Sequence, residues 1–323
     1  MRCIKLRAAN LKSFYFTLGV IVTITAVILS ASVFLVNDKL TALKFNPDDQ
    51  YPQGYRIVTP PIPGELEFAG ERVPVENFEV YERIEREFIV STYFHSLTIL
   101  AIKRANRWFP VIEPILSRNN VPDDFKYLCV IESTLENVVS PAGATGFWQF
   151  MQDAGEKYGL EINSQVDERY HVEKSTQAAC SYLIDAYENY GTWTMAAASY
   201  NMGTNGADDQ LERQKTDNYY NLVLNFETSR YIARIVAIKY IMQNLKAYGF
   251  DIKDEELYKP LKTYEINLDS SVDNFADYSI ALGLNYKILK LYNPWLRDTT
   301  LTIRDRKVYK IKIPVKGSIK IIN

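Results

Sequence analysis

The sequence predicts a mainly α-helical protein that ends in a small β-α-α-β unit. Between residues 108 and 250, apolar residues recur at helical spacing, and no run alternates with a period of two. Gly159, Gly191 and Gly249 each follow a periodic segment, at the position where a left-handed residue commonly ends a helix. After residue 260 the pattern changes to short alternating runs, which are typical of half-buried strands.

The N-terminal region has the pattern of a membrane anchor. Residues 1–13 carry four basic side chains and no acidic one, and residues 14–36 are 23 positions without a charge. At about 1.5 Å per residue, such a helix spans about 34 Å, which exceeds the ~30 Å hydrocarbon core. We therefore expect an uncleaved anchor at 14–36, a cytoplasmic segment at 1–13, and the remaining chain outside. A signal peptide cleaved after Ser30-Ala-Ser32 is the alternative.

Residues 37–75 contain six prolines and little periodicity, so we interpret them as an extended linker. A catalytic domain is expected from residue 76 to residue 250. Its first segment, residues 76–107, is predicted to be helical, with its run of charges on a solvated face.

A buried helix that carries one carboxylate is predicted around residues 122–133. Pro122 suits a first helical turn, and apolar residues recur at helical spacing up to Glu132 at the C-terminal end. A stretch of small residues, 140–146, follows and allows close backbone approach, and an aromatic and amide stretch, 147–150, comes next. Apolar surroundings raise the pKa of a carboxyl group, so this arrangement suits a general acid in a saccharide cleft.

Further helices are expected at 149–158, 172–190, 192–202 and 227–248. In the tail, 260–323, strands are expected at 263–266 and 308–313, with helices at 272–282 and 286–291 between them.

The composition excludes several classes of function. The net charge of −2 provides no basic surface for nucleic acid, whose binding depends on phosphate neutralisation. Two His and three scattered Cys lack metal-ligand spacing, so neither a metal nor a cofactor is expected. Cys129 and Cys180 lie in apolar helical patterns and are expected as buried free thiols, although a disulfide between them is an alternative.

Four ordered motifs resemble those of the family 1 lytic transglycosylases, in particular their membrane-bound type D branch. They are Glu132-Ser133, Gly146-Phe-Trp-Gln149, Ser199-Tyr200-Asn201 and Glu227-Thr-Ser-Arg-Tyr231, and the resemblance covers residues 108–250. The family's second motif more often has Leu-Met before the Gln, and its third begins with Ala. The tail resembles a LysM glycan-binding module, with Asp269-Ser-Ser-Val272 in place of the usual Gly-Asp-Thr-Leu start.

The resemblance implies a lysozyme-like catalytic domain that acts on peptidoglycan glycan strands. Glu132 would be the single general acid and base, and Ser133 would orient it. The substrate-binding residues implied are Ser133, Ser140, Gln149, Met151, Tyr200, Asn201, Glu227 and Tyr231. The Tyr200 hydroxyl would point at the catalytic carboxyl or at the scissile sugar. Met151 and Tyr231 fit ordinary core contacts equally well.

Two other functions stay open at this point. A hydrolytic muramidase or chitinase on the same scaffold would need a second carboxylate to hold a water. A non-catalytic peptidoglycan-binding protein would need no buried acid. The anchor and the resemblance together place the protein in the cell envelope, at the inner membrane, with the catalytic domain in the periplasm.

Overall fold

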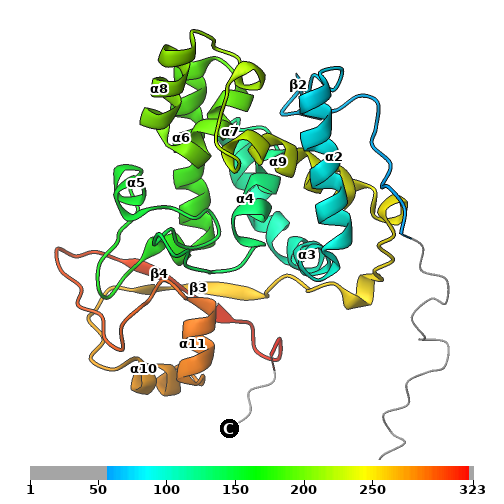
Figure 1. Ribbon diagram of the computed structural model, residues 1–323. Helices are drawn as coiled ribbons and strands as arrows, with labels where there is room; N and C mark the ends of the chain where they lie inside the picture. Colours follow the sequence, from blue (N-terminus) through cyan, green and yellow to red (C-terminus); the bar gives the residue numbers. More distant parts are fainter. Residues whose placement is uncertain (1–56, 320–323) are drawn as a thin grey trace, which may run out of the picture. The chain divides into compact units, whose positions relative to one another are not determined.

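The computed structural model describes residues 57–319 (Figure 1), and residues from Thr59 onward form one compact unit. The predicted anchor at 14–36 and most of the predicted linker lie outside the described residues. Within residues 57–319, no helix combines the length and the apolar character needed to cross a membrane.

The helical part of this unit holds most of the secondary structure. Its helices are α2 (Phe78–Tyr93), α3 (His95–Arg118), α4 (Phe125–Ser133), α5 (Gln152–Lys157), α6 (Val172–Tyr190), α7 (Trp193–Met202), α8 (Thr204–Gln214) and α9 (Tyr231–Gln243). Short 3-10 turns occur at Glu168–Tyr170, Tyr219–Asn221, Thr228–Arg230, Leu245–Tyr248 and Asp254–Glu256. Between residues 108 and 250 the chain forms only isolated bridges and no strand, as the sequence predicts.

Helix α4 is at the centre of this part. Seven of its nine residues are buried, and it packs against α3 and α9, with α2, α6 and α7 around it (Figure 1). The left-handed residues Thr134 and Leu135 end the helix directly after Glu132-Ser133. The chain therefore turns sharply beyond Glu132, so the side chain of Glu132 comes from the last turn of a buried helix.

Several boundaries differ from the sequence-based expectation. The segment expected as one helix over 76–107 forms two, α2 and α3, which meet at Phe94 with φ −84° and ψ 57°. The helix expected over 227–248 is α9 with a 3-10 turn on each side. Helix α6 has the predicted bounds, and Gly191 ends it with φ 72°.

The linker interpretation is wrong for residues 66–75. Strands β1 (Glu67–Phe68) and β2 (Glu71–Arg72) form a hairpin, and Phe68 is completely buried against Phe125 of α4. The turn residues Ala69 and Gly70 both have positive φ, which suits a two-residue hairpin. A hairpin this short leaves no clear period-two pattern, which explains why the sequence did not reveal it.

The tail has the predicted β-α-α-β order, with β3 (Thr263–Leu268), α10 (Phe275–Ala281), α11 (Tyr286–Tyr292) and β4 (Tyr309–Pro314). Strands β3 and β4 are antiparallel, with Tyr264 opposite Ile313. Tyr309, Ile311 and Ile313 are buried, as their alternation with Lys310 and Lys312 predicts. The tail has its own apolar core, which also contains Val166 from the helical part.

Hydrogen bonds join the tail to the segment before α6. The backbone N–H of Asp167 donates to the Trp295 carbonyl over 2.9 Å, and that of Arg297 donates to the Gln165 carbonyl over 2.8 Å. Ion pairs add to this junction: Lys312 contacts Glu173, and Lys307 Nζ is 2.6 Å from Glu161 Oε2. The tail therefore packs on the helical part, which a unit of this size needs for stability.

Candidate active site

The carboxyl group of Glu132 meets a hydroxyl from a helix 99 residues further along the chain. Tyr231, the first residue of α9, donates a hydrogen bond to Glu132 Oε1. Tyr231 is 1% exposed, whereas Glu132 is half-buried as a residue. This contact brings the first and fourth sequence motifs together.

The surroundings of Glu132 raise its pKa above the ordinary value. Burial is the largest cause, because it penalises the charged carboxylate. The Tyr231 hydrogen bond and the positive charge of Arg234 act in the opposite direction, and the negative charge of Glu227 acts with burial. Glu132 is thus favoured in the protonated form that a general acid needs.

Ser133 joins the first motif to the second. It is buried, and its hydroxyl donates to the Phe147 carbonyl over 2.8 Å and to the Cys129 carbonyl over 3.2 Å. Both acceptors are backbone carbonyls, so the Ser133 hydroxyl holds the end of α4 against the 146–149 motif. This geometry favours the orienting role expected for Ser133.

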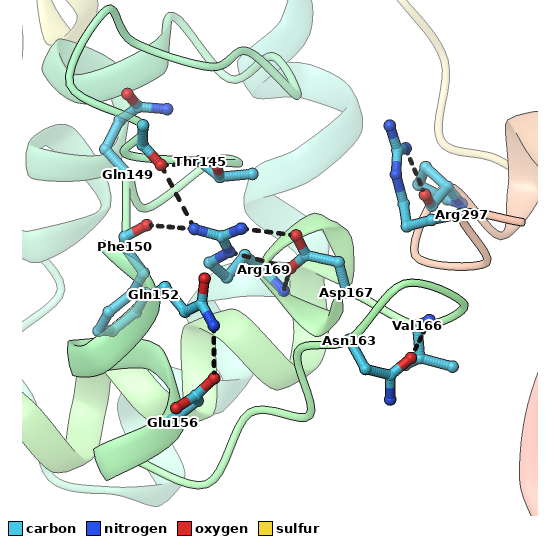
Figure 2. A network of polar contacts seen from close by, with 12 residues as sticks. Thr145, Gln149, Phe150, Gln152, Glu156, Asn163, Val166, Asp167, Arg169 and Arg297 are labelled. Atoms are coloured by element: carbon cyan, nitrogen blue, oxygen red, sulfur yellow. Dashed lines mark hydrogen bonds and ion pairs between the residues drawn. The ribbon is translucent and has the colours of Figure 1, made fainter.

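Gly146 lets this loop approach the rest of the chain closely. A Cβ atom at this position would lie 2.0 Å from the Arg169 carbonyl oxygen, and its φ of 84° is also unfavourable for other residues. Figure 2 shows the guanidinium of Arg169 between the loop and Asp167. It donates to the Gly143 and Phe150 carbonyls, each over 3.3 Å, and forms a bidentate pair with Asp167.

Gln149 and Ser140 are also tied into this loop. Gln149 has φ 49°, and its Nε2 donates to the Gly146 carbonyl over 2.7 Å and to the Val138 carbonyl over 3.2 Å. Ser140 Oγ accepts from the Ala144 N–H over 3.0 Å. Both side chains shape the loop, and neither has a hydrogen bond to Glu132 within the described part of the chain.

The Tyr200 hydroxyl donates to the Trp148 carbonyl over 2.7 Å, and so joins the third motif to the second. Of its two expected orientations, the one toward the Glu132 carboxyl is therefore not seen, and the one toward the scissile sugar stays a prediction. Burial raises the pKa of Tyr200 well above its ordinary value, and the charge of Glu132 adds to this effect, so the two side chains are near each other. The hydroxyl that donates to the Glu132 carboxyl group comes instead from Tyr231, a buried residue at the start of α9.

The third and fourth motifs are joined by Asn201, whose Oδ1 accepts from the Thr228 hydroxyl over 2.8 Å. Glu227 next to it is exposed, and so is Met151, at 48%. Exposure removes the core-contact alternative for Met151 and leaves both side chains available to a ligand. All four motifs are therefore connected by side-chain hydrogen bonds.

Sequence reasoning missed Arg234, Thr228 and the Arg169–Asp167 pair. Arg234 donates to the Ile131 carbonyl over 3.0 Å and lies one helical turn after Tyr231. A single Arg within the apolar run of α9 was the available signal, because a charge on a buried helix needs a partner.

The two described cysteines, Cys129 and Cys180, are buried free thiols, as favoured from the sequence. Burial raises the pKa of Cys180 to about 12. Within residues 57–319, no group of three or more His, Cys, Asp or Glu residues is placed to hold a metal ion.

Comparison with protein families identifies both parts of this fold. Residues 110–223 match the transglycosylase SLT domain, and residues 264–317 match the soluble lytic transglycosylase C-terminal LysM-like domain. Over these two ranges the chain is therefore similar to an SLT domain followed by a LysM-like domain, in agreement with the mainly helical fold and its β-α-α-β end. The SLT match includes Glu132, Gln149 and Tyr200 and ends before Glu227.

Curated relatives agree with this assignment. The chain is 25% identical over 232 residues to the membrane-bound lytic murein transglycosylase D of Escherichia coli K12. The protein of the same name from Escherichia coli O6:H1 gives the same identity over the same length. The alignment covers 70% of this chain and 50% of each relative, so the chain spans about half the length of these proteins.

Proposed function

We propose that this protein is a peptidoglycan lytic transglycosylase, with Glu132 as its single general acid and base. The enzyme cleaves the β-1,4 bond between N-acetylmuramic acid and N-acetylglucosamine and leaves a 1,6-anhydromuramic acid end. The observation that carries the proposal is the placement of Glu132, half-buried at the end of α4 with the Tyr231 hydroxyl on its Oε1. The matches to the SLT and LysM-like domains support it.

The reaction uses one carboxyl group twice, first as an acid and then as a base. Protonated Glu132 donates its proton to the glycosidic oxygen as the bond from C1 of the muramic residue breaks. The carboxylate then takes the proton of the C6 hydroxyl, whose oxygen bonds to C1 and closes the anhydro ring. General acid and base help of this kind contributes about 10²–10⁴-fold.

Tyr231 and Arg234 fit the second half of this cycle. Both favour the ionised form of Glu132, which exists after the first proton transfer. Burial favours the protonated form. The two kinds of influence thus act in opposite directions on a group that would both give and take a proton.

Hydrolysis is the second candidate, because one observation favours it. Glu227 is exposed and close enough for its charge to raise the pKa of Glu132. A hydrolytic muramidase needs a second carboxylate that holds a water on the opposite face of the sugar. We favour ring closure because this chain matches lytic transglycosylase domains.

Mass spectrometry of the products from purified murein sacculi tests the proposal. A lytic transglycosylase releases muropeptides that are lighter by one water than the hydrolytic products. Release of hydrated muropeptides alone would assign the protein to the hydrolases. Absence of any soluble product, with binding to sacculi retained, would make it a wall-binding protein.

We further propose that the protein acts in the periplasm from an anchor at residues 14–36. The uncharged run behind four basic residues supports this location, as does similarity to a relative named membrane-bound. N-terminal sequencing of the protein from membranes tests the anchor, and a mature terminus near Ser32 would refute it.

A further inference from the structure

A cavity of about 860 Å³ lies between the helical part and the LysM-like tail. Trp108 of α3, the loop residue Asn137 and Tyr264 of β3 contribute to its wall. Glu132 and Tyr231 do not, so the cavity is distinct from the candidate active site. Its volume falls within the range of about 300–1,000 Å³ that is usual for sites that bind small molecules.

Aromatic and apolar groups form much of the wall. Trp108 is half-buried, with its ring edge-on to Phe147 at 5.1 Å between centroids. Tyr264 is 52% exposed and Leu291 of α11 is 60% exposed, although both line the cavity. Flat apolar surfaces suit the C–H faces of pyranose rings, in the way that aromatic rings contact other flat apolar groups.

Charges around the cavity are balanced. The wall contains three basic and three acidic side chains, namely Arg104, Arg107, Lys312, Glu136, Glu173 and Glu265. Two ion pairs form among them, Arg104–Glu136 and Lys312–Glu173. A balanced set gives no field for a polyanion or for a peptide with several carboxylates. It suits a neutral ligand that is rich in hydroxyl and amide groups.

Asn137 supplies an independent observation. Its Nδ2 donates to the Tyr170 carbonyl over 3.2 Å, whereas its buried Oδ1 has no hydrogen-bond partner within residues 57–319. A buried acceptor without a partner is unfavourable. Because this oxygen is closed to solvent, a ligand reaches it through a turn of the Asn137 side chain, which lines the cavity. An N-acetylated sugar offers both N–H and O–H groups to such an acceptor.

We propose that this cavity is a second saccharide site, which binds a neutral N-acetylated glycan segment beside the active site. The wall residues Glu136 and Asn137 follow the left-handed turn at Thr134 and Leu135 that ends the helix of Glu132, so a glycan held here stays near the candidate active site. Such a grip raises the local concentration of substrate without touching the reacting bond. The choice of wall glycan as the natural ligand rests on the proposed function, but the ligand chemistry does not.

The probe is the tetramer of N-acetylglucosamine, titrated into the full chain with Glu132→Gln so that nothing is cleaved. Hydrogen exchange with mass spectrometry then locates the binding. We expect protection in peptides that cover 135–137 and 263–265, in addition to any protection at 227–231. Calorimetry in the same background gives the affinity of each site.

Two substitutions remove the proposed contacts. Tyr264→Ala and Asn137→Ala should each weaken binding at the cavity at least tenfold and abolish protection at 263–265. Tyr81→Ala, at a tyrosine of α2 that is 40% exposed and outside the wall, is the matched control and should change neither. Leu291→Ala serves as a third variant if circular dichroism shows that one of the others has not folded.

Three outcomes would overturn the proposal. They are no protection at the wall, unchanged affinity in the Tyr264 and Asn137 variants, and protection by an acidic tetrapeptide stem but not by the sugar. Failure of the proposed function would be recognised separately, because that function is tested by mass spectrometry of the products that the wild-type protein releases from sacculi. Wall protection without anhydro products would support the site and reject the lytic reaction.

Discussion

The surroundings of Glu132 and the junction with the tail are held together in different ways. Around Glu132, the hydroxyl groups of Tyr231, Ser133 and Tyr200 donate to one carboxylate or to backbone carbonyls. At the tail junction, ion pairs between partly exposed side chains supplement the backbone bonds. Buried hydrogen bonds fix geometry to a fraction of an ångström, whereas exposed ion pairs contribute little and tolerate movement.

The comparison shows which part of the molecule needs a precise geometry of its side chains. Proton transfer requires donor and acceptor within hydrogen-bond distance, so the site depends on groups that cannot rearrange. Holding a glycan strand requires only contact over an area. The five predictions below test this difference and run from the largest expected effect to the smallest.

Glu132→Gln should lower turnover of sacculi by about 10²–10⁴-fold, because the amide keeps the shape but has no transferable proton. Release of anhydro-muropeptides and thermal unfolding are measured together, and the unfolding temperature should stay near the wild-type value. Glu188→Gln, at an exposed carboxylate of α6, is the control and should retain full activity. Turnover above a few per cent of wild type in the Glu132 variant would exclude Glu132 as the catalyst.

Gly146→Ala should destabilise the protein and reduce activity together. The added Cβ would meet the Arg169 carbonyl at 2.0 Å, and the positive φ itself costs about 1–2 kcal/mol. Gly143→Ala is the matched control in the same loop, because its φ is 89° but no atom lies within 4 Å of the added Cβ. Thermal unfolding should separate the two, and equal losses would show that the close approach is unimportant.

Tyr231→Phe should shift the pH dependence of activity and lower its maximum. Glu132 must be protonated to act as an acid, so activity falls as the pH rises through its pKa. The Tyr231 hydrogen bond lowers that pKa, so its removal should move the alkaline limb to higher pH. The maximum should fall roughly 10–100-fold, since a hydrogen bond to a charged group contributes about 1.5–3 kcal/mol.

Glu227→Gln provides the opposite test in the same assay. The charge of Glu227 raises the pKa of Glu132, so this substitution should move the alkaline limb to lower pH. Shifts of both variants in one direction would contradict the assigned environment of Glu132.

Lys312→Met should have the smallest effect, a loss of stability that appears only at pH values above the acidic range. Burial acts to raise the pKa of Glu173, but His171 and Lys312 hold this pKa at about 2. A lowered pKa contributes stability above the ordinary carboxyl pKa of about 4.3, and this stability is lost as the pH falls toward 2. Thermal unfolding at pH 7 should show a loss below about 1 kcal/mol, which shrinks at pH 2. An equal loss at both pH values would mean that the charge of Lys312 is unimportant.

The sequence by itself determined the helices that have strong periodicity and clear ends. Helix α6 has its predicted bounds because an apolar stripe is followed by Gly191, which takes the left-handed conformation. The strand β4 was predictable from the alternation of Ile311 and Ile313 with lysines. The apolar helix that ends in Glu132 was also a local pattern, but the role of Glu132 as the acid is a prediction that rests on the resemblance. These features depend on contacts within a few residues along the chain.

Only the tertiary structure decided which hydroxyl meets Glu132, how the four motifs are connected, and that the 66–75 segment belongs to the core. Tyr231 and Tyr200 both lie in segments with helical periodicity, and the local sequence does not show where either side chain points. The start of α9 brings Tyr231 to a carboxyl group 99 residues away, and the cavity at Asn137 forms between elements that are more than 100 residues apart. Such arrangements follow from packing between distant segments, which no periodicity of a single segment encodes.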